Sequence, residues 1–216
     1  MGLDEELHIQ EGITAIIGSG GKTTLLRALA RGLDGRVVLT TSTHIRPFPG
    51  IPTVEHTPLP ARVSCVATME NPLKLAAPRE SFSALAEAAR YVLVEADGSK
   101  ELPLKAHASY EPVIPAGSTQ TILVVGASGF GRPVRTTVHR PEIFCRLAGC
   151  SLDDIATPEL VARAIRTEAL ADRLLVNQAD TPELRHEAEQ LAALVGLPAW
   201  IGSLSSPLQA QASPAQ

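Results

Sequence analysis

The chain has 216 residues and a formal net charge of −4, with 19 basic and 23 acidic residues spread along it. This length suits one substantial α/β domain, and the mixed charges leave no basic surface of the kind that nucleic acids require. No stretch is apolar over the roughly 18 positions of a membrane span, and the first ten residues are acidic and polar. We therefore expect a cytoplasmic protein that binds neither nucleic acid nor a membrane.

A glycine-rich turn between an apolar run and a helix is the most informative stretch of the chain. Residues 13–17, Ile-Thr-Ala-Ile-Ile, are typical of a buried parallel strand. The turn and the start of the helix contain Gly18, Ser19, Gly20, Gly21, Lys22, Thr23 and Thr24. Glycines allow backbone N–H groups to turn towards an anion, while Lys22 adds positive charge and the Thr23 hydroxyl suits Mg²⁺. We expect this stretch to bind the phosphates of a nucleoside triphosphate.

The helix after the turn places four leucines on one face, and Gly35 is expected to end it. Its N-terminus points towards the bound phosphate. The usual phosphate-loop pattern, GxxxxGK[ST], has a glycine where this chain has Ile16. The form found here, GxxGKTT, resembles the loops of muramyl-peptide ligases and their relatives. A turn that binds nothing is the alternative, but packing gives no reason for Lys-Thr-Thr directly after such a turn.

A second apolar run, residues 91–94, is followed by Glu95 and Asp97. This pattern predicts a central strand that delivers a carboxylate to the phosphate end of the sheet. Glu95 is the first candidate to hold Mg²⁺ or orient the attacking water, and Asp97 is the second. An acidic turn after a strand is the alternative. The candidate catalytic residues are Lys22, Glu95 and Asp97, and the candidate Mg²⁺ ligands are Thr23 and Glu95.

Two further groups of side chains are expected near the phosphate loop. Hydroxyls at residues 40–43 follow the predicted strand 36–41, where one could reach Mg²⁺ or the γ-phosphate. A turn closed by its own hydrogen bonds explains the same residues equally well. Lys100 and Lys105 are candidates for meeting an anionic substrate, although each singly better fits a solvated surface lysine.

The strand at residues 174–176 ends in Asn177, Gln178, Ala179 and Asp180. This wording resembles the NKxD base-recognition motif of GTPases, in which the aspartate accepts two hydrogen bonds from guanine. Asn177 would brace neighbouring loops. The lysine that usually stacks on the base is Gln178 here, which softens the case for guanine, and Asp180 also suits the residue before a helix cap. We expect GTP or ATP, with a slight preference for GTP.

These elements together predict an α/β fold, a three-layer sandwich like that of P-loop NTPases with a mostly parallel central sheet. Residues 1–204 are expected to form a single nucleotide-binding domain. Residues 205–216 are low in apolar content and are expected to form a flexible tail. The prolines of residues 45–61 predict a surface excursion.

As a set, the stretches GSGGKTT, TTSTHI, VEADGSKELPLKA with EPVIP, and LLVNQAD resemble the accessory proteins of selenium-dependent molybdenum hydroxylases. That family consists of small P-loop proteins, and the resemblance extends from about residue 13 to residue 203. It implies a role in maturing a molybdenum enzyme, either its labile selenium or sulfur centre or its cofactor. It also implies a protein partner, either that hydroxylase or its maturation machinery.

The leading hypothesis is thus a Mg²⁺-dependent NTPase that serves as an accessory factor in metalloenzyme maturation. An ATP-using kinase or ligase that activates a small acid is the alternative, suggested by the ligase-like loop and by Lys100, Lys105 and Arg132. A third hypothesis is a non-catalytic, nucleotide-gated binding module whose proline-rich segment 45–61 docks a partner.

Overall fold

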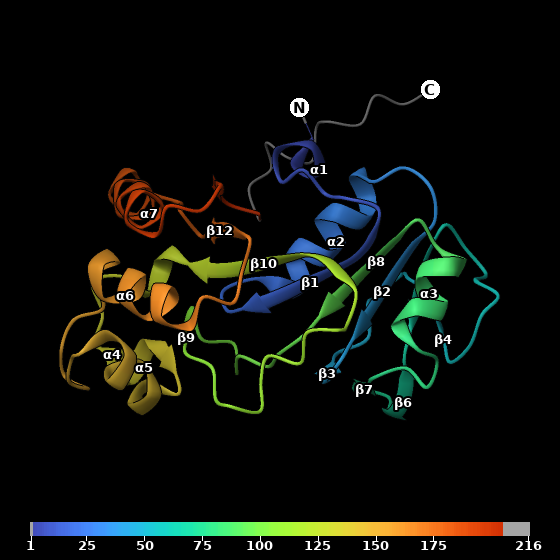
Figure 1. The fold of residues 1–216 in the computed structure, drawn as a ribbon, viewed down its shortest axis with the longest axis horizontal. Helices are drawn as coiled ribbons and strands as arrows, with labels where there is room; N and C mark the ends of the chain where they lie inside the picture. The colour runs from blue at the N-terminus through green and yellow to red at the C-terminus, as the bar shows by residue number, and fades with distance from the viewer. Residues whose placement is uncertain (1, 205–216) are drawn as a thin grey trace.

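The computed structural model describes residues 2–204, and its centre is a sheet of eight strands in the order β13-β12-β10-β1-β8-β2-β5-β4 (Figure 1). The strands are β1 (Gly12–Gly18), β2 (Val37–Thr41), β4 (Thr53–Val54), β5 (Val63–Val66), β8 (Tyr91–Glu95), β10 (Ser118–Gly126), β12 (Arg173–Asn177) and β13 (Ala199–Ile201). All neighbouring strands are parallel. The predicted tail, residues 205–216, lies outside the described residues.

The helices are α1 (Leu3–Glu6), α2 (Lys22–Gly32), α3 (Phe82–Ala88), α4 (Val134–Thr137), α5 (Pro141–Ala148), α6 (Pro158–Glu168) and α7 (Pro182–Val195). One face of the sheet packs against α1 and α2. The opposite face packs against α5, α6 and α7 over one half and against α3 over the other. The predicted α/β fold, with helices on both faces of a parallel sheet like that of P-loop NTPases, is confirmed.

The central strands are apolar because both of their faces are covered. Alternate residues of β1 enter different core clusters: Ile16 faces α2, whereas Ile17 packs with residues of α5 and α6. Both side chains are fully buried. Such two-sided burial explains why the strand is a continuous apolar run rather than an alternating one.

Short strands form two smaller sheets beside the main one. An antiparallel sheet contains β3 (His44–Ile45), β7 (Lys74–Ala76) and β6 (Thr68–Asn71) in that order, and β9 (Leu104–Lys105) pairs in parallel with β11 (Val138–His139). The proline-rich excursion is more regular than predicted, since it supplies the edge strand β4 of the main sheet. An edge strand tolerates neighbouring prolines because one of its sides needs no ladder hydrogen bonds.

Helix ends follow local chemistry closely. Thr157 and Thr181 cap α6 and α7 by accepting hydrogen bonds from backbone N–H groups three residues on, and a proline opens each helix. By contrast, α2 ends at Gly32, three residues before the predicted Gly35, because Leu33 is already extended. Between residues 2 and 204, the structure has no helix with the length and apolar character to cross a membrane.

Parallel pairing places the carboxyl ends of all eight strands along one edge of the sheet. The strand β1 lies between β8 and β10, so the turn at Gly18 is flanked by the residues that follow Glu95 and Gly126. Ligands of open α/β sheets bind outside this edge. The predicted site residues all belong to segments that reach it.

Candidate nucleotide-binding site

Two glycines fit the phosphate loop closely against the end of β10. Gly18 and Gly20 have φ values of 93° and 87°, which side chains rarely allow. A Cβ on Gly18 would lie 2.3 Å from the carbonyl oxygen of Val124, and one on Gly20 would lie 2.4 Å from the backbone nitrogen of Gly126. The loop therefore needs glycine at these positions for both conformation and space.

The helix that follows the loop begins at Lys22, after Gly21 with φ of 132°. No side chain caps this N-terminus, so its first N–H groups suit a phosphate group. The Lys22 side chain is 3% exposed, and its ammonium group donates to the carbonyl oxygen of Gly18 at 2.7 Å. Thr24 is exposed on the first turn of the helix. The side-chain hydrogen bonds of this turn are made by Lys22 and Thr23.

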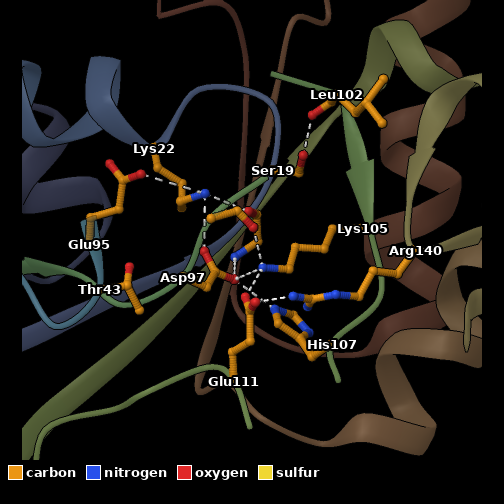
Figure 2. Close-up of polar contacts among 12 residues, drawn as sticks. Ser19, Lys22, Thr43, Glu95, Asp97, Leu102, Lys105, His107, Glu111 and Arg140 are labelled. Atoms are coloured by element: carbon orange, nitrogen blue, oxygen red, sulfur yellow. Dashed lines mark hydrogen bonds and ion pairs between the residues drawn. The ribbon is translucent and has the colours of Figure 1, made fainter. Parts of the chain in front are cut away.

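Figure 2 shows Lys22 between Glu95, the last residue of β8, and Asp97, two residues further on. Its Nζ lies 3.0 Å from Oδ1 of Asp97 and 3.8 Å from Oε1 of Glu95. The Thr23 hydroxyl donates to Oε2 of Glu95 at 3.0 Å. The pairing of β1 with β8 produces this arrangement, because it brings the phosphate loop beside the strand that carries the acids. The three predicted catalytic residues and both predicted Mg²⁺ ligands are therefore neighbours.

The hydroxyl and carboxylate of Thr23 and Glu95 are hard oxygen donors, which suit Mg²⁺. Among residues 2–204 no group of three or more His, Cys, Asp or Glu side chains could enclose a metal ion. A Mg²⁺ ion would thus take its remaining ligands from phosphate oxygens and water, as this ion commonly does. The donor set fits a nucleotide-bound magnesium better than a resident structural metal.

Burial raises the pKa of Glu95, and the neighbouring Asp97 adds to this effect. The Lys22 charge and the Thr23 hydrogen bond oppose it without cancelling it. A carboxyl with a raised pKa accepts a proton more readily at neutral pH than an ordinary one. The Glu95 carboxylate of the metal-free site is therefore more basic than that of an exposed glutamate.

Asp97 is the most connected residue of the site and is fully buried. One of its oxygens accepts from the Gly18 N–H at 2.8 Å and lies 2.9 Å from Nζ of Lys105 and 2.8 Å from Nε2 of His107. Burial alone would raise the pKa of this carboxyl, but the His107 hydrogen bond and the Lys22 and Lys105 charges lower it far below its usual range. Asp97 thus stays charged and holds the phosphate loop in place.

His107 continues this network to helix α6. Its Nδ1 lies 2.8 Å from Oε2 of Glu168, and its backbone N–H donates to Oε1 of the same residue at 2.6 Å. Burial opposes a charge on the ring, but the hydrogen bonds that the ring donates to Asp97 and Glu168 outweigh it and raise the pKa of His107. The imidazole is therefore clamped between two carboxylates.

Lys105 extends the network in the other direction. Its side chain is 1% exposed, and its Nζ lies 2.6 Å from Oε2 of Glu111. It also donates to the carbonyl oxygen of Gly98, and Glu111 in turn pairs with Arg140. Our prediction of a solvated surface lysine is wrong for Lys105. Its short strand β9 pairs with β11, and oxygens of Gly98, Asp97 and Glu111 replace the water that its ammonium group loses.

The hydroxyls at the end of β2 and in the turn after it bond to nearby protein groups. Thr40 donates to the carbonyl oxygen of Val66 at 2.6 Å, and Thr41 donates to that of Glu95 at 2.8 Å. The Thr43 N–H donates to the Thr41 hydroxyl, which is a local bond, whereas the Thr40 and Thr41 hydroxyls donate to other segments of the sheet. These residues fix the strand ends around Glu95, and Thr43 is the half-buried hydroxyl drawn beside that acid in Figure 2.

Asn177 connects the phosphate loop to the last loop of the sheet. Its amide donates to the carbonyl oxygen of Gly20 at 2.7 Å and accepts from the Leu204 N–H at 2.9 Å. Asp180 lies exposed in the same segment, while the Gln178 side chain accepts from Ser128 at 2.6 Å. The Ser19 hydroxyl donates to the carbonyl oxygen of Leu102. Asn177 and Ser19 therefore brace the loop, and Asp180 is free to face solvent.

Sequence reasoning missed four members of this network: His107, Glu111, Arg140 and Glu168. Glu111 belongs to the EPVIP stretch, which contributes to the family resemblance. The sequence therefore marked this segment, but it did not indicate what Glu111 would contact. Glu168 is an ordinary last residue of helix α6. Only the packing of that helix against the sheet gives it a partner 61 residues away.

A protein-family model described as "YqeC protein" matches residues 14–142, more than half of the chain. The chain belongs to the YqeC family. The match begins in β1 and ends at the start of α5, so it includes the phosphate loop, both acids and Arg140, whereas Glu168, Asn177 and Asp180 lie beyond it. A relative from Escherichia coli (strain K12), "Uncharacterized protein YqeC", is 35% identical over 159 residues, which are 65% of this chain and 62% of that protein. The chain thus spans less than two thirds of this relative's length.

Proposed function

We propose that this YqeC-family protein is a Mg²⁺-dependent nucleoside triphosphatase. The observation that carries the proposal is the placement of Thr23 and Glu95, 3.0 Å apart, beside Lys22 at the carboxyl edge of a parallel sheet. A turn that bound nothing would have no reason to hold a buried lysine and two acids at one helix N-terminus. Burying such charges is costly without a function or a full set of partners.

Each residue has a distinct task in this proposal. The backbone of residues 18–21 and the N-terminus of α2 would hold the phosphates, and Lys22 would balance their charge. Mg²⁺, held by Thr23 and Glu95, would neutralise charge on the phosphate oxygens. Glu95 would also accept the proton of the attacking water. Asp97 would keep Lys22 and Gly18 in position.

Replacing Lys22 with alanine tests whether the loop binds a nucleotide. We expect Lys22→Ala to weaken Mg²⁺-nucleotide binding by a factor of about 10 to 100, because a hydrogen bond to a charged group contributes about 1.5–3 kcal/mol. Isothermal titration calorimetry with a non-hydrolysable GTP analogue measures the change. Exposed Lys74, which pairs with Glu70 on the small antiparallel sheet, provides the control Lys74→Ala. Equal affinity of Lys22→Ala and wild type would contradict the proposed site.

In our proposal, Asp180 determines whether the site prefers guanine or adenine nucleotides. GTP is expected to bind better than ATP, and Asp180→Ala to reduce that preference by about tenfold, because the guanine donors lose their acceptor. Competition of GTP and ATP for a fluorescent nucleotide measures both affinities. The control is Glu189→Ala, which removes an exposed acid from helix α7. An unchanged GTP-to-ATP ratio in Asp180→Ala would show that this residue does not read the base.

We further propose that the nucleotide is used in maturing a selenium-dependent molybdenum hydroxylase. The support is the resemblance of GSGGKTT, VEADGSKELPLKA, EPVIP and LLVNQAD to the accessory proteins of those enzymes. Protein substrates of this kind would stimulate turnover only when the nucleotide site is intact.

A small-molecule kinase or ligase is the second candidate. It is favoured by one observation: Lys105 and Arg140, two cationic side chains largely withdrawn from water, lie in the network that begins at the phosphate loop. Such an enzyme would hydrolyse its nucleotide slowly until its acceptor was present.

A further inference from the structure

The paired strands β9 and β11 carry a group of polar side chains beside the phosphate loop. Lys105 and His139 are register partners in this pair, and Arg140 follows His139 directly. Glu111 joins the two cations, with its Oε2 2.6 Å from Lys105 and its Oε1 paired with Arg140. We call Lys105, Glu111, His139 and Arg140 the β9–β11 cluster. Figure 2 shows Lys105 and Arg140 both pointing towards Glu111, with Asp97 beside Lys105.

Arg140 has more hydrogen-bonding capacity than the described residues use. Its Nη2 contacts Glu111 and the Tyr110 hydroxyl, and its guanidinium lies 5.1 Å from the Tyr110 ring centre. Its Nη1 is buried and has no hydrogen-bond partner within residues 2–204. Buried polar groups in native proteins nearly always have partners. A buried guanidinium nitrogen without an acceptor therefore points to an acceptor supplied by a ligand.

The surroundings of His139 show that positive charge prevails in the cluster. Burial lowers the pKa of His139 to about 4, and the charges of Lys105, Arg140 and Lys100 act in the same direction. Glu111 is the one acid that opposes them. Glu111 is shared between Lys105 and Arg140, and Lys105 also pairs with Asp97. Arg140, whose Nη1 has no acceptor among the described residues, is therefore the group of the cluster that an anion would contact.

The cluster is joined to the phosphate loop by direct contacts. Arg140 pairs with Glu111, Glu111 with Lys105, and Lys105 with Asp97, whose carboxylate also holds Gly18. A molecule held by Arg140 would thus sit next to the nucleotide rather than at a remote surface.

We propose that Arg140, assisted by His139 and Lys100, binds the oxyanion group of a second substrate, a small molecule with a carboxylate or a phosphate. The proposal rests on the proposed nucleotide site, because a second substrate held by Arg140 could receive a phosphoryl group only from a nucleotide bound beside it. Because Nη2 is already held by Glu111 and Tyr110, Nη1 of the guanidinium would donate a charge-assisted hydrogen bond to an oxygen of either group. Lys100 is exposed in the loop before β9, where it adds charge without belonging to the buried pairs.

The test measures anion binding separately from nucleotide binding. Full-length protein saturated with Mg²⁺-GDP is titrated by calorimetry with inorganic phosphate in one series and with succinate in the other, which distinguishes the two oxyanion sources. We expect Arg140→Gln to weaken the preferred anion at least tenfold and Lys100→Ala to weaken it about threefold. Lys100→Ala keeps the test valid if Arg140→Gln unfolds, since Lys100 is outside the buried network.

A matched control exists at the opposite end of the sheet. Arg90 also pairs with a glutamate, Glu11, at 2.7 Å, and its guanidinium lies 5.5 Å from a tyrosine ring. Arg90→Gln therefore removes the same kind of contacts and should leave anion affinity unchanged. Equal anion affinity in wild type, Arg140→Gln and Lys100→Ala would overturn the proposal.

Lys22→Ala separates this proposal from the proposed function. Anion binding that persists in Lys22→Ala but is weakened by Lys100→Ala supports the subsite, even if wild type proves to bind no nucleotide. Anion binding that is lost in Lys22→Ala and insensitive to Arg140→Gln would mean that the phosphate loop alone binds the anion, and the subsite would be rejected.

Discussion

Glu95→Gln is expected to slow nucleotide hydrolysis by a factor of about 100 or more, the usual cost of removing a general base, while nucleotide affinity stays within about threefold of wild type. Glutamine can still accept the Thr23 hydrogen bond now made to Oε2 at 3.0 Å, so the local structure should be preserved. What it cannot do is take a proton from water or balance Mg²⁺ with a full charge. Single-turnover measurements with radiolabelled GTP and Mg²⁺ separate the chemical step from binding.

The pH profile provides a second measure of the same residue. Burial raises the pKa of Glu95 in the metal-free site. Only the ionised form accepts a proton, so wild-type turnover should fall at acidic pH as this carboxyl becomes protonated. This acidic limb should be absent from Glu95→Gln. The control Glu11→Gln removes an exposed acid far from the site. Equal turnover of Glu95→Gln and wild type would reject Glu95 as the base.

Wild type and Glu95→Gln can also be used to test whether a protein partner stimulates turnover. If turnover serves enzyme maturation, adding an apo selenium-dependent molybdenum hydroxylase should raise the rate of wild type and not that of Glu95→Gln. Stimulation by small acids instead would favour the kinase or ligase. A rate that no addition changes would remove the support for a maturation role.

The parallel sheet could be predicted because its signals are local. The strands β1, β8 and β12 are uninterrupted apolar runs, and each ends in residues that turns or ligands require. In a parallel sheet these ends must meet at one edge, so the proximity of Lys22 to Glu95 follows from strand order alone. The same reasoning placed Asn177 near the phosphate loop.

The buried charge network could not be predicted, because each charge is buried only by virtue of distant partners. Lys105 is an ordinary lysine until Asp97 and Glu111 surround it, and these contacts require the pairing of β9 with β11. Two-residue strands give no periodic signal. His107 likewise depends on Glu168 at the end of α6. A strongly apolar sequence predicts its own burial, whereas a charged one does not.

Asp97→Asn is expected to lower the free energy of unfolding by about 3–5 kcal/mol, the usual cost of removing one partner from a buried ion pair. Asparagine is nearly the same size, so packing changes little. The loss comes from leaving Lys22, Lys105 and His107 buried without the negative charge that they share. Urea denaturation followed by circular dichroism measures it. Glu101→Gln removes an exposed charge that pairs with Arg46 at 2.9 Å, and should cost at most about 1 kcal/mol.

The pH dependence of stability distinguishes the charge of Asp97 from its shape. The pKa of Asp97 is lowered in the folded protein, so its contribution is present above the unfolded pKa of about 3.9 and is lost as the pH falls further. The pKa of His107 is raised, so its contribution is complete below about pH 6.5 and is lost as the pH rises through the folded value. The difference between wild type and Asp97→Asn should therefore be largest between these limits. If the difference in free energy of unfolding stayed constant from pH 3 to pH 9, the loss in Asp97→Asn would come from altered hydrogen-bond geometry. The charge of Asp97 would then not be what stabilises the loop.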